Sequence, residues 1–152
     1  MDKRALITEL SARLAAELER CTAQAKDAAE GATHEENRSE GDKDMRATEA
    51  SYVARGQAQR AAELQTAISQ LAAMPVRTFG AGDRIAVSAL VELDGERTYF
   101  LVTAGGGERV AGVTTLATQS PLGRALLGLE VGDEAEVATP QGTKSHEITD
   151  VR

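Results

Sequence analysis

The chain changes its hydrophobic period at Pro75, and this change limits the folds that it can adopt. Before Pro75, apolar side chains recur in steps of three and four, which places them on one face of a helix. The first stripe consists of Leu6, Ile7, Leu10, Leu14, Leu18, Cys21, Ala25 and Ala28. The second stripe consists of Val53, Gln57, Ala61, Leu64, Ile68 and Leu71. Because two such narrow stripes need cover, we expect an antiparallel helical hairpin.

The ends of the two helices are also marked in the sequence. The first helix is predicted from Asp2 to about Glu30, and Gly31 is predicted to end it, since glycine is common just past a helix C-terminus. The second helix is predicted from near Asp44 to about Met74, before Pro75. The single cysteine, Cys21, excludes an internal disulfide and is predicted to pack in the first stripe.

After Pro75 the sequence is typical of strands. Residues 84–104 alternate and are rich in β-branched residues, with a hairpin turn predicted at Asp94-Gly95. Gly105 to Gly107 predict a turn, and residues 110–118 predict one strand. Two further strands are predicted from Glu134 to the end, joined by a turn at residues 140–142.

Residues 120–128 predict a short helix. Ser120 is a suitable N-cap, Pro121 suits the first helical position, and Gly128 suits the position beyond the end. The fold class is therefore predicted as α+β. Residues 1–74 form an antiparallel coiled-coil hairpin, and residues 75–152 form a small antiparallel sheet domain with one short helix.

The charge distribution excludes some functions. The net charge is −7, both halves are acidic, and no basic run or stripe is present, so we expect no autonomous binding to nucleic acid. The N-terminus does not resemble a signal peptide, and no apolar stretch is long enough for a membrane span. We therefore expect a cytoplasmic protein without a membrane partner.

A dense acidic cluster lies between the two helices, at residues 33–49. It holds six carboxylates and three cations. Such acids can be solvated charges at the start of a helix, where they are favoured, and Asp44 can serve as an N-cap. They can also serve as hard oxygen ligands for a cation. A zinc site is disfavoured, because His34 has Arg38 where a zincin helix has its second histidine.

The C-terminal stretch QSPLGRALLGLEVGDEAEVATPQGTKSHEITDVR resembles the bacterial transcript cleavage factors GreA and GreB. The matching positions are Ser120, Pro121, Arg124, Ala125, Leu126, Leu127, Gly132, Asp133, Thr139, Pro140 and Gly142. The resemblance implies an FKBP-like C-terminal domain that docks on RNA polymerase. It also implies a coiled coil that enters the secondary channel, where acids at its tip help to hold Mg²⁺ at the polymerase active centre during cleavage of backtracked RNA.

Carried onto this sequence, the resemblance assigns roles to particular residues. Asp42 and Asp44 are the first candidates for assisting the polymerase-bound metal, and only in the complex; Glu40 and Glu49 are the second. The predicted partner-binding residues are Ser120, Pro121 and Arg124. The protein is then not an enzyme by itself, has no cofactor of its own beyond the Mg²⁺ shared with polymerase, and is expected to be a monomer.

The tip departs from the family pattern Gly-Asp-x-x-Glu-Asn-Ala-Glu-Tyr. Gly41-Asp42 matches, but the next acid, Asp44, stands two positions after Asp42, whereas in the family pattern it stands three positions after. When the pattern is aligned on Tyr52 instead, Met45 and Thr48 occupy the acidic positions. An alternative is therefore a channel-occupying regulator that does not stimulate cleavage.

Two alternatives belong to other classes of protein. One is an FKBP-type prolyl isomerase, which is disfavoured because apolar ligand pockets need aromatic side chains and this half offers only Phe79, Tyr99 and Phe100. The other is a coiled-coil adaptor with no link to polymerase.

Overall fold

The computed structural model describes residues 1–36 and 42–152, with side chains described for residues 1–31 and 47–152. Their contacts divide the chain into two compact units. One unit comprises Met1–Ser11 and Ser69–Arg152, and the other comprises Ala12–Ile68. The ends of both helices therefore belong to the same unit as the sheet.

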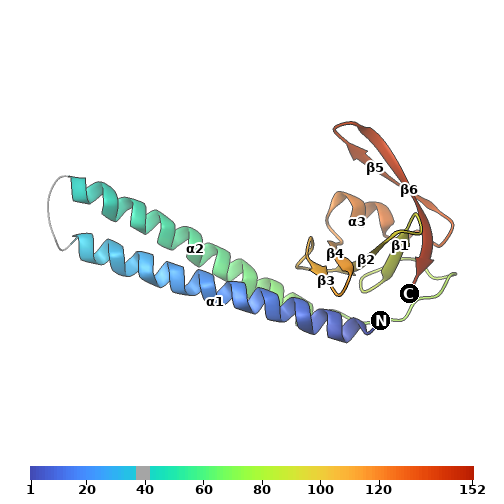
Figure 1. Cartoon of the computed structure of the whole chain (residues 1–152), viewed down its shortest axis with the longest axis horizontal. Coiled ribbons are helices and arrows are strands. Elements are labelled where there is room, and N and C mark those ends of the chain that lie inside the picture. The colour runs from blue at the N-terminus through green and yellow to red at the C-terminus, as the bar shows by residue number, and fades with distance from the viewer. Residues whose placement is uncertain (37–41) are drawn as a thin grey trace. The chain divides into compact units, whose positions relative to one another are not determined.

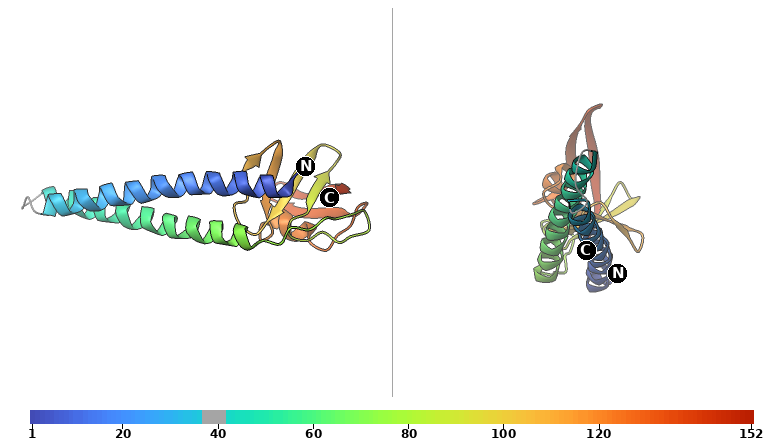
Figure 2. Two further views of the ribbon diagram at one scale, coloured as in Figure 1. Left: turned by 90° about the horizontal axis from the view of Figure 1, so that it is seen from below. Right: turned by 90° about the vertical axis from the view of Figure 1, so that its left-hand side faces the viewer.

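The N-terminal half is a helical hairpin. Helix α1 spans Lys3–Glu36 and helix α2 spans Asp42–Ala73, and the two lie side by side in opposite directions (Figures 1 and 2). Within the unit of residues 12–68, the buried side chains are Leu14, Cys21, Ala47 and Leu64. The predicted hairpin and the packing role of Cys21 are confirmed.

The inner face of α2 differs from the prediction at one position. Val53 is 51% exposed, and Ala54 is the half-buried residue. The buried and half-buried positions in steps of three and four are Ala47, Ala50, Ala54, Gln57, Ala61, Leu64, Ile68 and Leu71. The expectation for Val53 was wrong, because both a step of three and a step of four back from Gln57 fit a helical stripe, and the structure takes the step of three to Ala54.

Gly31 does not end the first helix. Helix α1 continues through it to Glu36, and Gly31 is not among the glycines with positive φ. A helix-interior glycine costs only about 1 kcal/mol relative to alanine. The predicted end was therefore wrong, because one glycine without a following proline does not stop a helix.

The C-terminal domain contains a mixed six-stranded sheet in the order β3-β4-β2-β1-β6-β5. Its strands are β1 Leu90–Leu93, β2 Arg97–Val102, β3 Arg109–Val110, β4 Val113–Ala117, β5 Glu134–Thr139 and β6 Gly142–Val151. Strands β2 and β4 pair in parallel, and the other neighbouring strands pair antiparallel. The α+β class, with a helical hairpin followed by a small sheet domain, is confirmed.

Two tight turns decide where the strands begin and end. The predicted turn at Asp94-Gly95 is present, with φ of 56° and 68°, as a type I′ hairpin requires. A second turn at Ala111-Gly112, with φ of 49° and 82°, divides the predicted strand 110–118 into β3 and β4. That strand prediction was wrong, because alanine seldom adopts positive φ and gave no turn signal.

A single apolar cluster fills the interior of the sheet domain. It is formed by Phe79, Ile85, Ala89, Val91, Leu93, Leu101, Leu126, Ala135, Ile148 and Val151. Leu126 comes from the short helix α3, Pro121–Leu126, so this helix is attached to the sheet through the core.

The packed interface between α1 and α2, which we call the seam, predicts different losses of stability for two apolar positions of α2. We expect Leu64→Ala to lower the free energy of unfolding by about 2–5 kcal/mol, because it leaves a cavity in the seam. We expect Val53→Ala to change it by less than about 0.5 kcal/mol, because Val53 is exposed. Urea unfolding of both variants measures this. Equal losses in the two variants would contradict the observed register of α2.

Candidate functional site

Ser120 fixes the start of α3. Its hydroxyl donates to the carbonyl oxygen of Ala117 at 2.7 Å and accepts from the backbone amide of Gly123 at 3.1 Å. The backbone amide of Arg124 then donates to the carbonyl oxygen of Ser120 at 2.8 Å. The predicted N-cap and the proline at the first helical position are confirmed.

Gly123 sets how closely α3 approaches the end of β4. A β-carbon at this position would overlap the carbonyl oxygen of Ala117, so no larger residue fits without a shift of the backbone. Leu126, one turn later, is fully buried in the core cluster. Both contacts hold α3 from its inner side, and its outer side is left to solvent.

The outer side of α3 forms a small surface of mixed character. Pro121 and Arg124 are exposed, and Leu127, which follows the helix, is 39% exposed. These three residues are spaced three apart, so they share one face of the helix. Within the described part of the chain, no carboxylate pairs with the guanidinium of Arg124. We call Ser120, Pro121, Arg124 and Leu127 the α3 corner.

The structure therefore brings together the three residues that the sequence selected for partner binding, and adds a fourth. Because the Ser120 hydroxyl donates to Ala117 and accepts from Gly123 within the corner, it holds Pro121 in position, and its contact with a partner remains a prediction. Leu127 was not assigned a role from the sequence. The signal that could have found it is the three-residue spacing Pro121, Arg124, Leu127.

The predicted tip acids are only partly described. Asp42 is the first residue of α2, but the side chains of Asp42 and Asp44 lie outside the described residues, as does Glu40. Glu49 is exposed on α2. Among the described residues, no group of three or more His, Cys, Asp or Glu side chains is arranged to hold a metal ion. The grouping of the tip acids remains a prediction.

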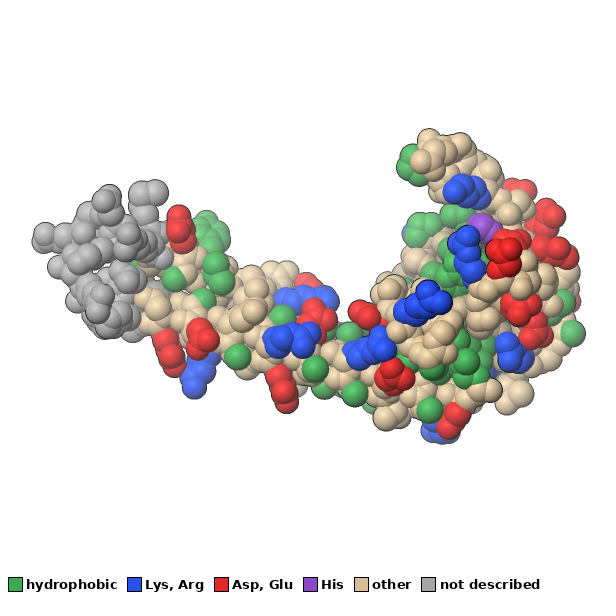
Figure 3. Space-filling model, viewed as in Figure 1, with side chains coloured by type: hydrophobic (Ala, Val, Ile, Leu, Met, Phe, Trp, Pro, Cys, Tyr) green, Lys and Arg blue, Asp and Glu red, His purple; other side chains and the backbone are tan. Residues whose placement is uncertain are grey.

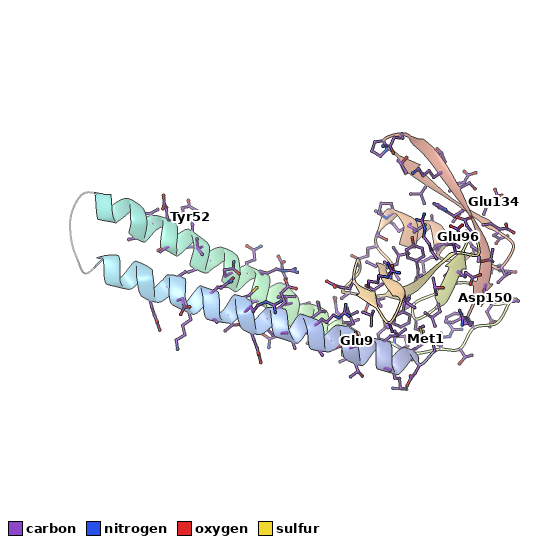
Figure 4. The ribbon with its side chains drawn as sticks, viewed as in Figure 1. Met1, Glu9, Tyr52, Glu96, Glu134 and Asp150 are labelled. Carbon is purple, nitrogen blue, oxygen red and sulfur yellow. The ribbon has the colours of Figure 1, made fainter. Side chains whose placement is uncertain are left out.

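One turn of α2 near these acids carries an exposed aromatic residue. Tyr52 is 70% exposed and points away from α1 (Figure 4). The guanidinium of Arg55 lies 5.9 Å from the centroid of its ring. This contact covers part of the ring with a cation from the same helix.

Two hydrogen bonds of Asp94 fix the β1–β2 turn. Its Oδ2 lies 2.8 Å from Nδ1 of His146, and its Oδ1 accepts a hydrogen bond from the backbone amide of Glu147 at 2.9 Å. The bond with His146, followed by the bond with Glu147, lowers the pKa of the Asp94 carboxyl. The pair joins the turn to β6 and so has a structural role.

The surface charges show no long basic stripe on the face that Figure 3 presents. Acidic and basic side chains alternate along the described part of the hairpin, and both signs occur over the sheet domain (Figure 3). This distribution agrees with the net charge of −7. Among the described residues, no helix has the length and hydropathy needed to cross a membrane.

The sequence and the fold were compared with known proteins. Residues 81–152 match the family model "Transcription elongation factor, GreA/GreB, C-term". Among curated relatives, the transcription elongation factor GreA of Hyphomonas neptunium is 42% identical over 86 residues, which is 55% of this chain and 50% of that protein. GreA of Thioalkalivibrio sulfidiphilus is 33% identical over 96 residues, which is 61% of each. The matched part is thus about half to three fifths of these relatives.

A crystal structure of GreA factor homolog 1 of Thermus thermophilus covers 93% of this chain and 94% of its own, with 22% identity and a TM-score of 0.40. The matched residues 81–152 contain the whole α3 corner and all six strands. Residues 81–152 are therefore similar to the C-terminal domain of the GreA/GreB transcription elongation factors.

Proposed function

We propose that this protein is a transcription elongation factor that binds RNA polymerase through the α3 corner and places the tip of its hairpin in the polymerase secondary channel. The match of residues 81–152 to the GreA/GreB C-terminal model carries this proposal, because the exposed corner lies within the match. On this proposal the protein acts in the cytoplasm and modulates the active site of its partner without an active site of its own.

The dimensions of the helices suit this role. Helix α1 has 34 residues and α2 has 32, so each is roughly 50 Å long at a rise of about 1.5 Å per residue. A pair of helices is much narrower than a globular domain. A hairpin of this length can carry side chains into a channel that excludes such a domain.

The tip acids suit a magnesium ion that polymerase holds. Asp42 and Asp44 would provide carboxylate oxygens, which are the hard ligands that Mg²⁺ prefers, and one or two of them can complete a site assembled by another protein. Such an ion supplies activation of water and stabilisation of the leaving oxygen. The contribution of this chain is to place the carboxylates.

A second candidate function is occupation of the channel without stimulation of cleavage. The spacing of the acids favours this function. Asp44 stands two positions after Asp42, not three as in the family pattern. When the family pattern is aligned on Tyr52 instead, Met45 and Thr48 stand at its acidic positions. In that case the hairpin competes for the channel and adds no ligand to the metal.

The other classes of protein fit less well. In the sheet domain, Phe100 is fully buried, Tyr99 is half-buried and Phe79 lines a cavity without the other two, so the three aromatics do not together line one apolar pocket of the kind a prolyl isomerase needs. A coiled-coil adaptor without a link to polymerase would not need the GreA/GreB-type C-terminal domain that residues 81–152 match. The arrangement of the aromatics and this match both support the elongation factor.

A change of Pro121 tests the docking surface. We expect Pro121→Asp to weaken binding to the cognate RNA polymerase by at least about tenfold, because it puts a carboxylate next to Arg124 on the exposed face. The fold should survive, because an acidic residue is favoured in the first turn of a helix. Co-purification with polymerase and surface plasmon resonance measure the affinity.

Ala81→Asp is the matched control, since it adds the same charge at another exposed position of the sheet domain. It should leave the affinity unchanged. If Pro121→Asp binds as well as the parent, or if both variants lose equally, the α3 corner is not the docking surface.

A change at the tip tests the role of the acids. We expect the double variant Asp42→Asn/Asp44→Asn to bind polymerase normally but to lose stimulation of RNA cleavage, with partial rescue by excess Mg²⁺. Asparagine keeps the size and the capping capacity of aspartate and removes only the charge. Cleavage of RNA in stalled elongation complexes measures the effect.

The control for the tip is the double variant Glu19→Gln/Asp27→Asn, which removes two exposed carboxylates from α1. It should stimulate cleavage like the parent. Full activity of the Asp42→Asn/Asp44→Asn variant would mean that these acids are solvated charges only. A parent protein that binds polymerase and never stimulates cleavage would favour the channel-occupying regulator.

A further inference from the structure

A cavity of about 420 Å³ opens in the unit that contains the sheet, where the start of α1 meets the chain around Arg77 and the end of β6. The N- and C-termini lie close together here in all views of Figures 1 and 2. Met1, labelled in Figure 4, is among the residues that line the cavity. The proposed function uses no residue of this cavity.

The lining of the cavity is strongly cationic. It includes Lys3, Arg4, Arg77 and Arg152, and Asp2 is its only acidic side chain among the described residues. This is a local excess of positive charge in a chain whose net charge is −7. A cavity with one sign of charge concentrates counter-ions of the other sign.

Of these four cations, Arg152 is the only one that forms an ion pair with an acidic side chain among the described residues. Arg152 Nε lies 2.9 Å from Oδ2 of Asp150, so its charge is partly neutralised. For Arg4 and Arg77, by contrast, the described residues provide no carboxylate within ion-pair distance of the guanidinium, and both side chains are exposed. These two groups are free to bind an anion.

The cations are held in place by the fold. The ammonium of Lys3 lies 4.9 Å from the centroid of the Phe79 ring, and the guanidinium of Arg77 lies 5.1 Å from it. Phe79 is only 5% exposed and belongs to the core cluster, so the ring is a fixed support for both charges.

Lys3 also joins the walls of the cavity. It donates to the carbonyl oxygens of Arg77 at 2.6 Å and Arg152 at 2.8 Å. Burial, followed by the nearby charge of Arg152, lowers the pKa of Lys3 to about 8. The smaller of these two causes, the repulsion by Arg152, is one that a bound anion would offset.

We propose that this cavity binds a small phosphate-bearing anion through the guanidinium groups of Arg4 and Arg77. The planar guanidinium can present two parallel N–H donors to phosphate oxygens, and it stays charged at every physiological pH. The volume is within the range of about 300–1,000 Å³ typical of small-molecule sites, so there is room for a diphosphate and for the organic part of a nucleotide.

A change of Asp2 tests the proposal through an expected gain of anion affinity, whereas the arginine variants test it through a loss. Its Oδ1 accepts the backbone amides of Arg4 at 2.9 Å and Ala5 at 3.3 Å, so it caps α1. Its negative charge at the same time opposes an anion in the cavity. Asparagine caps a helix about as well as aspartate, so Asp2→Asn removes the charge and keeps the cap.

The experiment is isothermal titration calorimetry of the full chain with inorganic pyrophosphate and, separately, with ADP, at low ionic strength. We expect one site per chain, a loss of affinity of about tenfold or more in Arg4→Gln/Arg77→Gln, and a gain of several-fold in Asp2→Asn. Arg20→Gln/Arg84→Gln removes two exposed guanidiniums that do not line the cavity and should bind like the parent.

The two ligands identify the source of the phosphate. Equal affinities mean that the site binds the phosphates alone, and tighter binding of ADP means that the nucleoside is also bound; either result supports the site. No binding by millimolar ligand overturns the proposal, and so do equal losses in the two double variants. Circular dichroism checks that the arginine variants are folded. The gain of affinity expected for Asp2→Asn tests the proposal even if the arginine variants do not fold.

Discussion

The seam between α1 and α2 is the contact on which the hairpin depends. Isolated helices of this kind are marginally stable in water, and most of the stability of a helix in a protein comes from its packed face. Here that face is one side chain wide, and leucines such as Leu14 and Leu64 each contribute roughly 1.5–3 kcal/mol when buried. The cross-helix pair of Arg60 with Glu17, at 3.0 Å, lies partly in solvent and adds at most about 1 kcal/mol. Because the seam is so narrow, the outer faces of both helices remain polar, which suits the proposed entry of the hairpin into an aqueous channel.

The α3 corner follows a different principle, in which a short helix is held by a few close contacts. Six residues are too few for a helix to be stable by itself, so its position comes from the capping bonds of Ser120, the close approach of Gly123 to Ala117, and the burial of Leu126. These contacts are all on the inner side. The proline, the arginine and the leucine on the outer side are thus presented on a rigid support, as a docking surface requires.

Charge is used in two distinct ways in this chain. The acids of residues 33–49 are concentrated where the sequence offers almost no apolar side chain to bury, which leaves them available to a cation held by a partner. The cations around Lys3 and Arg77 are instead anchored on a buried aromatic ring and on carbonyl oxygens, which fixes them for an anion. In the proposed function the first arrangement is completed by polymerase, whereas the second is formed within the fold.

The sequence by itself determined those features whose cause is local. The helical hairpin follows from apolar steps of three and four, the turn at Asp94-Gly95 from the two residues that tolerate positive φ, and α3 from Ser120 and its following proline. The partner-binding residues of the corner could be named because they fall within this helix. The tip acids could be named as well, although their side chains lie outside the described residues.

Only the tertiary structure decided the features that depend on residues far apart in the sequence. The parallel pairing of β2 with β4 has no local signal, and the turn that separates β3 from β4 has only that of Gly112, because the alanine before it does not predict positive φ. The cationic cavity is the clearest case. Lys3 bonds to Arg77 and Arg152, which are 74 and 149 residues away, and no spacing rule connects such positions. They meet because the start of α1, the segment around Arg77 and the end of β6 line the same cavity.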